Sequence, residues 1–126
     1  MKRVLTAVML LSLAACNSGD STAGQAGTLT LRLTGASGND GAMLMIISGG
    51  AVSAVGTPAG YQIATNTDGA GTHVMVVGNL TAGAIATIVV PDVSQASAYV
   101  ATVVQVADRT SFALLDPVRY QVTISR

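Results

Sequence analysis

The sequence TLTLRLT at residues 28–34 decides the fold class, because it alternates strictly between two kinds of side chain. Leu29, Leu31 and Leu33 fall on one side of an extended chain, and threonines and an arginine fall on the other. Successive side chains of a strand point to opposite faces, whereas an amphipathic helix repeats every three to four residues. The segment is therefore predicted to be a strand with one buried face.

A second alternating segment, at 118–125, predicts the last strand of the same fold. Its expected inward-facing residues are Val118, Tyr120, Val122 and Ile124. Apolar, β-branched runs predict further strands at 42–48, 51–55, 61–65, 72–77, 84–90, 98–107 and 112–115. Gly, Asn, Asp and Pro separate these runs and supply the turns. The segment 98–107 also fits a helical period, but its β-branched residues favour a strand, and one helical turn is possible at 93–98.

The composition of the 126-residue chain agrees with one small all-β domain. Glu is absent, the only Lys is Lys2, and charged residues make up 10% of the chain. Eight or nine short strands in residues 28–126 predict a single antiparallel β-sandwich, with a closed barrel as the alternative. The chain has no basic patch, which argues against nucleic acid as a partner.

The N-terminal residues have the pattern of an export signal. Lys2 and Arg3 precede an apolar stretch at 4–15. This stretch is shorter than the roughly 20 residues that span a membrane. Residues 1–15 are therefore predicted to be a signal peptide, and residues 16–27 to carry a flexible polar linker. An ordinary signal peptide cut after Ala14 is the alternative.

The end of that stretch, Leu13-Ala14-Ala15-Cys16, resembles the lipobox of bacterial lipoproteins, and Cys16 is the only cysteine. The resemblance implies that Cys16 becomes the first residue of the mature protein and carries a diacylglyceryl group, with acyl chains such as palmitate. Two or three such chains give a stable anchor in a membrane, whereas one binds weakly. Asn17 follows the cysteine where Asp would imply retention in the inner membrane. The outer membrane of a Gram-negative envelope is the expected location, and a Gram-positive host would place the protein on its only membrane.

The order of segments over 28–126 resembles that of cohesin-type and carbohydrate-binding sandwiches. The resemblance rests on Asp40-Gly41-Ala42 before an apolar strand, Gly78-Asn79-Leu80, Ala84-Ile85-Ala86 and the alternating last strand. It implies a module for attachment outside the cell, to a protein or a glycan. The Tyr-Asp-Pro segment typical of cohesins is absent, and Ser48-Gly49-Gly50-Ala51 stands in its place, so dockerin binding is not implied.

Residues suited to catalysis or metal binding are few, which favours a non-enzymatic module. His73 is the only histidine and Cys16 is assigned to lipid, so no metal or cofactor is expected. A small envelope hydrolase using His73 with an Asp and a Ser is the alternative, although no Gly-x-Ser-x-Gly elbow is present. The loops with Asn39-Asp40 and with Asn66 and Asp68 offer oxygen ligands for Ca²⁺ but are interpreted as tight turns.

Two kinds of surface are candidates for ligand binding. An apolar patch on a sheet face is expected to come from Met43, Met45 or Met75. The rings beside loops that would stack on a sugar are Tyr61 and Phe112, whereas the period of their strands places Tyr99 and Tyr120 in the core.

Overall fold

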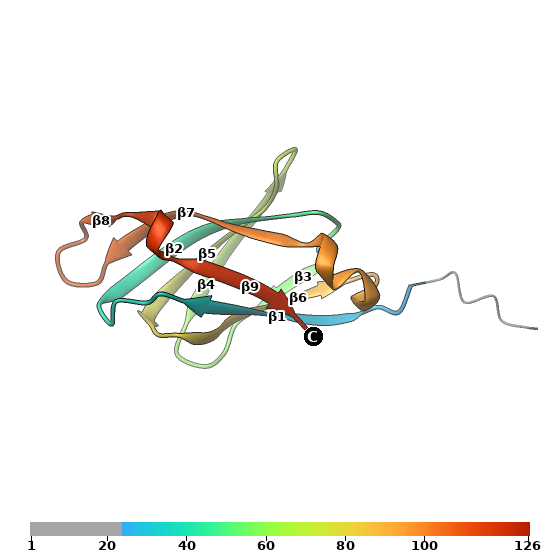
Figure 1. Ribbon diagram of the computed structural model, residues 1–126, viewed down its shortest axis with the longest axis horizontal. Coiled ribbons are helices and arrows are strands. Elements are labelled where there is room, and N and C mark those ends of the chain that lie inside the picture. Colours follow the sequence, from blue (N-terminus) through green and yellow to red (C-terminus); the bar gives the residue numbers. More distant parts are fainter. Residues whose placement is uncertain (1–23) are drawn as a thin grey trace, which may run out of the picture.

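The computed structural model describes residues 24–126, so the predicted signal peptide and Cys16 lie outside the described residues. The described chain is all-β, and its nine strands pair only in antiparallel fashion (Figure 1). Two short 3₁₀ helices complete the fold. Neither of these helices has the length and hydrophobicity that a membrane-spanning helix needs.

Each strand overlaps a predicted segment, with end shifts of up to three residues, and β3 shares only 54–55 with the predicted 51–55. They are β1 (Gly27–Thr34), β2 (Asp40–Ser48), β3 (Ala54–Gly56), β4 (Gln62–Asp68), β5 (Gly71–Leu80), β6 (Gly83–Val90), β7 (Val100–Asp108), β8 (Leu114–Leu115) and β9 (Gln121–Ser125). The 3₁₀ helices are η1 (Val93–Ala98) and η2 (Pro117–Arg119).

The strands form one continuous sheet that nearly closes on itself like a barrel. Hydrogen-bonded neighbours follow the order β3-β6-β1-β9-β7-β2-β5-β4, and β8 is attached to β7. One half of the sheet is β3-β6-β1-β9 and the other is β7-β2-β5-β4. The two halves meet where β7 pairs with β9 at a single position, Ala101 with Val122. The all-β, antiparallel prediction is confirmed. The continuity differs from the two separate sheets of the predicted sandwich, because alternation along a strand does not specify its neighbours.

The core lies between the two halves and follows the two-residue period of the strands. Leu29, Leu31 and Leu33 of β1 are buried, as predicted. In β2, Met43 and Met45 are also buried, so the prediction that they form a surface patch is wrong. The cause is the unbroken apolar run of β2, which does not reveal which alternate residues face inward.

The segment before β9 shows where the periodic pattern was extended too far. Val118 was predicted to face the core, but it is 88% exposed. Asp116 caps the helix η2 by accepting a hydrogen bond from the Val118 backbone N–H, which takes Val118 out of the strand. Tyr99 and Tyr120 are buried as predicted. The possible helical turn at 93–98 is present as η1, capped by Asp92.

A buried carboxylate connects the two halves at one end of the sheet. Asp40, the first residue of β2, is fully buried. The Tyr120 hydroxyl donates to Asp40 Oδ1 over 2.6 Å, and the Ser37 hydroxyl and backbone N–H donate to its two oxygens over 2.7 and 2.8 Å. A buried carboxylate requires such donors, because the loss of its hydration is costly. The Asn39-Asp40 loop is thus a structural turn whose acidic side chain faces inward.

Replacing Tyr120 by Phe is expected to lower the free energy of unfolding by about 1–3 kcal/mol, because it removes a hydrogen bond to a buried charged group. Burial, with a smaller contribution from Asp40, raises the pKa of the Tyr120 phenol. The stability that this phenol contributes is therefore complete below about pH 10 and lost as the pH rises through the raised pKa. Denaturant unfolding between pH 8 and 11 should show a smaller alkaline loss in the variant.

Tyr61→Phe is the matched control, because the Tyr61 hydroxyl binds the exposed Thr81 region instead of a buried carboxylate. Some alkaline loss should persist in Tyr120→Phe, since burial also raises the pKa of Tyr99. Equal alkaline losses in the wild type and Tyr120→Phe would contradict the assigned role of the Tyr120–Asp40 contact.

Candidate functional site

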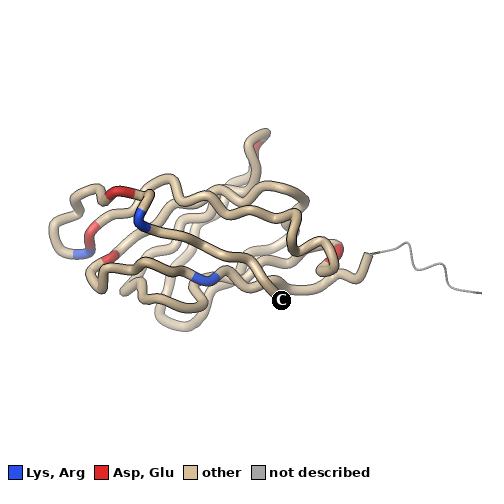
Figure 2. Tube along the Cα trace, viewed as in Figure 1, with Lys and Arg blue, Asp and Glu red and all other residues tan. Residues whose placement is uncertain are grey.

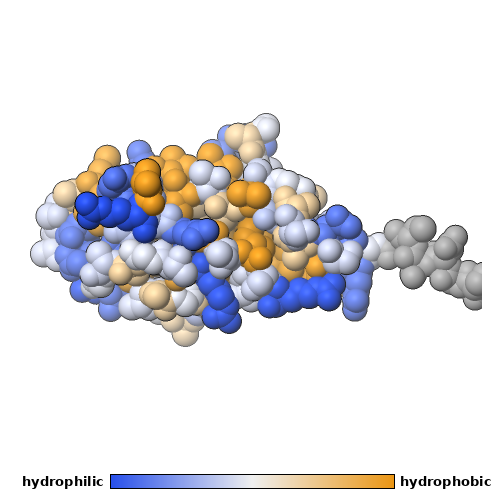
Figure 3. All heavy atoms as spheres, in the orientation of Figure 1, coloured by the Kyte–Doolittle hydropathy of each residue, from blue (hydrophilic) through white to orange (hydrophobic). Residues whose placement is uncertain are grey.

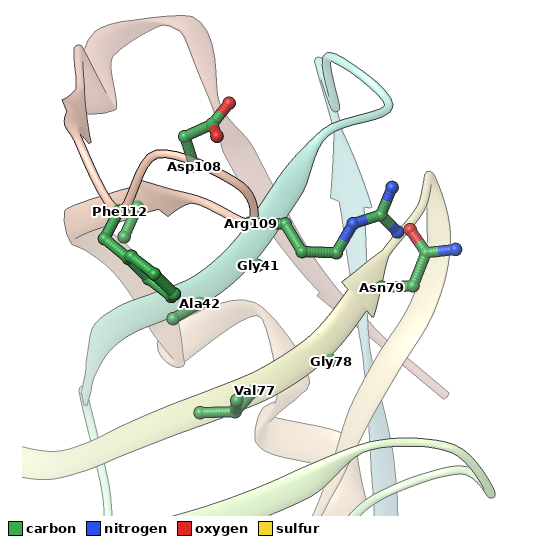
Figure 4. Close-up of a pocket in the computed structure, with 9 residues that line it drawn as sticks. Gly41, Ala42, Val77, Gly78, Asn79, Asp108, Arg109 and Phe112 are labelled. Carbon is green, nitrogen blue, oxygen red and sulfur yellow. The ribbon is translucent and has the colours of Figure 1, made fainter.

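The largest of three adjoining hollows lies on the outer face of β2, β5 and β7, at the end where Asp40 is buried. Its volume is about 480 Å³. The residues that give it its character are Ala42, Val77, Ala107, Asn79, Arg109 and Phe112 (Figure 4). Its walls are largely apolar, and its polar groups gather at one end. It is therefore suited to a ligand with an apolar body.

Two smaller hollows extend this one along the same sheet face. The first, about 140 Å³, shares Ala42 and Ala107 with the largest hollow. The second, about 180 Å³, shares Leu44 and Met75 with the first. The three together are called the outer groove below.

The register of the strands explains why the groove floor is apolar. Ala42 of β2 is opposite both Val77 of β5 and Ala107 of β7, and Leu44 is opposite Met75. Met75 and Val77 are each 41% exposed, and Leu114 at the groove margin is 70% exposed. Figure 3 shows further apolar residues at the surface over β7 and β8. Of the three methionines predicted to form a patch, only Met75 lies on this face.

Phe112 overhangs the largest hollow in a strained conformation. Its φ is 58°, in the left-handed region, and it is the only non-glycine residue of 24–126 with a positive φ. Its side chain is 79% exposed, so packing within the domain does not compensate for this conformation. The predicted strand at 112–115 is accordingly reduced to Leu114–Leu115. The position of this ring is held by the loop that carries it.

Asp108 holds that loop together. Its Oδ1 accepts hydrogen bonds from the backbone N–H groups of Thr110 and Ser111, both over 2.8 Å. Its Oδ2 accepts from the Asn39 side-chain amide over 2.6 Å, and the Phe112 N–H donates to the Asp108 carbonyl. The backbone N–H groups of Ser111 and Thr110, followed by the Asn39 amide, lower the pKa of Asp108 to about 2.

Charged residues cluster around this end of the molecule (Figure 2). Within residues 24–126, no carboxylate lies within ion-pair distance of the Arg109 guanidinium. Its one side-chain hydrogen bond is a long one, 3.5 Å to Asn39 Oδ1. Arg109 thus keeps most of its donors available at the polar end of the outer groove.

His73 lies at the far end of the outer groove, on the same face of β5 as Met75. Its Nε2 lies 2.9 Å from Asp68 Oδ2, close enough for an ion pair but not aligned as a hydrogen bond. The hollow beside it is lined by Leu44, Ala64, Thr65, Asn66 and Met75. The structure therefore brings one Asp to His73, as the hydrolase alternative requires, but no Ser lines this hollow.

The other predicted candidates lie apart from the outer groove or are engaged elsewhere. Tyr61 does not line the hollow under Phe112: its ring packs against Gly78, and its hydroxyl donates to the Asn79 carbonyl. Asp68 accepts a hydrogen bond from the Ala70 N–H within its own turn. Within 24–126, no three His, Cys, Asp or Glu side chains are grouped closely enough to hold a metal ion.

A second hollow of similar size, about 470 Å³, lies between the loop after β2 and the turn joining β4 to β5. Its walls are mostly Gly, Ala and Thr, and its only ionisable side chain is Asp68. It lacks both the apolar surface and the free charge of the outer groove, so the outer groove is the better candidate site.

Comparisons with protein-family models, curated proteins and solved structures give no match to this chain. The interpretation of the site therefore rests on its own geometry. Sequence reasoning missed Asn79 and Arg109, because nothing in their local pattern distinguishes them from ordinary loop residues. The unbroken apolar run of β2 did indicate that its second face is either packed against another segment or exposed as an apolar patch.

Acid is expected to loosen the loop that carries Phe112. An Asp side chain titrates near 3.8 without such contacts, and Asp108 titrates at about 2 in the folded chain. Because the folded pKa is the lower one, the stabilisation by Asp108 is complete above about pH 4 and is lost as the pH falls toward 2. The thermal midpoint should fall more steeply over this range in the wild type than in Asp108→Asn.

Asp116→Asn is the control for this titration, since that side chain accepts a single hydrogen bond, from the Val118 N–H. Its thermal midpoint should follow the wild type as the pH falls. If Asp108→Asn also follows the wild type, the carboxylate does not organise the loop.

Proposed function

We propose that this chain is a lipid-anchored, non-enzymatic binding module of the bacterial cell envelope, and that it presents the outer groove to a ligand. The observation that carries the proposal is Phe112, a bulky apolar side chain that is exposed and held at a positive φ over an apolar groove. The exposed ring gains nothing from packing within the domain, whereas contact with a bound ligand would bury it. The absence of a Ser from the hollow beside His73 supports a binding role over hydrolysis.

The position of the groove supports anchoring through the N-terminus. β1 begins at Gly27 beside η1, where the Val93 N–H donates to the Gln25 carbonyl. The largest hollow of the outer groove lies at the opposite end of the molecule (Figure 1). An anchor on Cys16 would therefore hold the groove away from the membrane. The lipobox resemblance supports that anchor, and Asn17 supports the outer membrane.

We also propose that the two halves of the sheet serve as the two layers of a β-sandwich. Both halves contribute to one core, and β7 and β9 pair at one position only. In this arrangement the outer face of β2, β5 and β7 is a layer surface available for attachment, scaffolding or recognition.

Cys16→Ser is expected to abolish the incorporation of radiolabelled palmitate, because serine lacks the thiol that receives the lipid in the lipoproteins that this chain resembles. Growth of bacteria expressing the chain with labelled palmitate, followed by autoradiography, measures this. Ser12→Ala, which leaves the cysteine unchanged, should still be labelled. Label on the Cys16→Ser chain would contradict the anchor.

Phe112→Gly is expected to weaken binding of the neutral dye Nile red at least fivefold without loss of thermal stability, measured by dye fluorescence and circular dichroism on the full chain. Glycine adopts a positive φ freely, and the variant removes an exposed ring, so stability should stay constant or rise by up to about 1 kcal/mol. Val118→Gly is the matched control, because Val118 is more exposed than Phe112 but lies outside the groove. Equal dye binding by the wild type and Phe112→Gly would contradict the groove as a binding site.

A further inference from the structure

We propose that the outer groove binds a single-chain amphiphile with an anionic head, of the long-chain fatty acid class, and that Arg109 and Asn79 bind the head. This inference rests on the proposed function of the groove as a binding site and names the chemistry of its ligand. The argument has three parts, which concern the polar end of the groove, its apolar floor and the backbone beneath that floor.

The polar end of the groove is suited to a carboxylate. Arg109 and Asn79 lie together at one end of the largest hollow, and Figure 4 shows that the Asp108 carboxylate points away from Phe112 and Val77. The Asp108 oxygens accept from N–H donors of its own loop and from Asn39, and neither oxygen lies within ion-pair distance of the Arg109 guanidinium. A guanidinium binds a carboxylate through two parallel hydrogen bonds, and the Asn79 amide is a further donor.

The rest of the groove is suited to a hydrocarbon tail. From Arg109 the floor continues over Ala42, Leu44 and Met75. Between Val77 and His73 it follows β5 for about 13 Å, at roughly 3.3 Å per residue. Met75 adapts its shape easily, because its side chain is unbranched and polarisable. The charge at one end and this apolar length together match an amphiphile with its head at Arg109.

The backbone beneath the floor argues for an acyl chain over a peptide. β2 is paired on both edges, with β5 and β7, and β5 is paired on both edges, with β2 and β4. An extended peptide on this face would find no backbone partners for its own N–H and C=O groups, and such groups are costly to bury unpaired. An acyl tail has no polar groups to satisfy.

The test compares dodecanoate with dodecanol, which has the same tail and a neutral head. Both are assayed by equilibrium dialysis, below their aggregation limits, against the full chain carrying Cys16→Ser so that no attached acyl chain competes. Dodecanoate should bind at least tenfold more tightly than dodecanol, because charge-assisted hydrogen bonds hold its head. Octanoate should bind at least tenfold more weakly than dodecanoate, since each methylene contributes about two- to fourfold.

Arg109→Gln should reduce dodecanoate affinity about tenfold and leave dodecanol affinity unchanged. Arg109→Lys retains the positive charge and should keep part of the preference for dodecanoate over dodecanol. This second variant tests the role of the charge even if Arg109→Gln folds poorly. Arg119→Gln is the matched control, because Arg119 is exposed near the same end of the molecule but does not line the groove.

Equal affinities for dodecanoate and dodecanol, or no effect of Arg109→Gln, would overturn this proposal. In either case, normal Nile red binding that Phe112→Gly still weakens would leave the groove as a site for another apolar ligand. If the wild type binds neither Nile red nor dodecanoate, the proposed function fails as well. Displacement of Nile red by an apolar peptide amide but not by dodecanoate would assign the groove to peptides and overturn the inference.

Discussion

The burial of one carboxylate, that of Asp40, constrains this structure more than any other single contact. An ionised group without partners in the core would be strongly destabilising, so Ser37 and Tyr120 are required around it. Tyr120 immediately precedes β9, which pairs with β1, whereas Asp40 begins β2 in the other half. The hydrogen bond between them therefore fixes how the two halves meet at this end, whereas the single β7–β9 pair, at Ala101, lies near the other end of β7.

The neighbouring residue connects this constraint to the surface. Asn39 donates its side-chain amide to Asp108, and its carbonyl accepts from the Arg109 N–H over 2.7 Å. Two consecutive residues thus act on opposite sides of the chain: Asp40 holds the core closed, and Asn39 holds the loop that bears Arg109 and Phe112. The geometry of the candidate site therefore depends on the same turn that closes the fold. Neither Asp40 nor its partner Tyr120 lines the groove.

The sequence predicted what depends on local alternation and missed what depends on neighbours. The buried leucines of β1 and the buried Tyr120 follow from a two-residue period. In β2 the unbroken apolar run does not show which alternate residues face inward. Met43 and Met45 were therefore assigned to the surface, although they lie in the core. Val118 was wrongly assigned to the core because the two-residue period of β9 was extended back into η2, which begins at Pro117. Arg109, Asn79 and Phe112 converge only because β2, β5 and β7 are adjacent, and no local pattern encodes that adjacency.

In the proposed binding role, the ordered loop lowers the entropic cost of binding a ligand in the open groove. A flexible loop would lose conformational entropy on binding, and this loss would oppose affinity. Here Asp108 has already ordered the loop through bonds to Thr110, Ser111 and Asn39, so Phe112 is in place before any ligand arrives. The unfavourable φ of Phe112 is compensated by these hydrogen bonds within the folded chain and not by the ligand. The free energy of contact with Phe112 and Arg109 is then available for affinity and for discrimination between ligand heads.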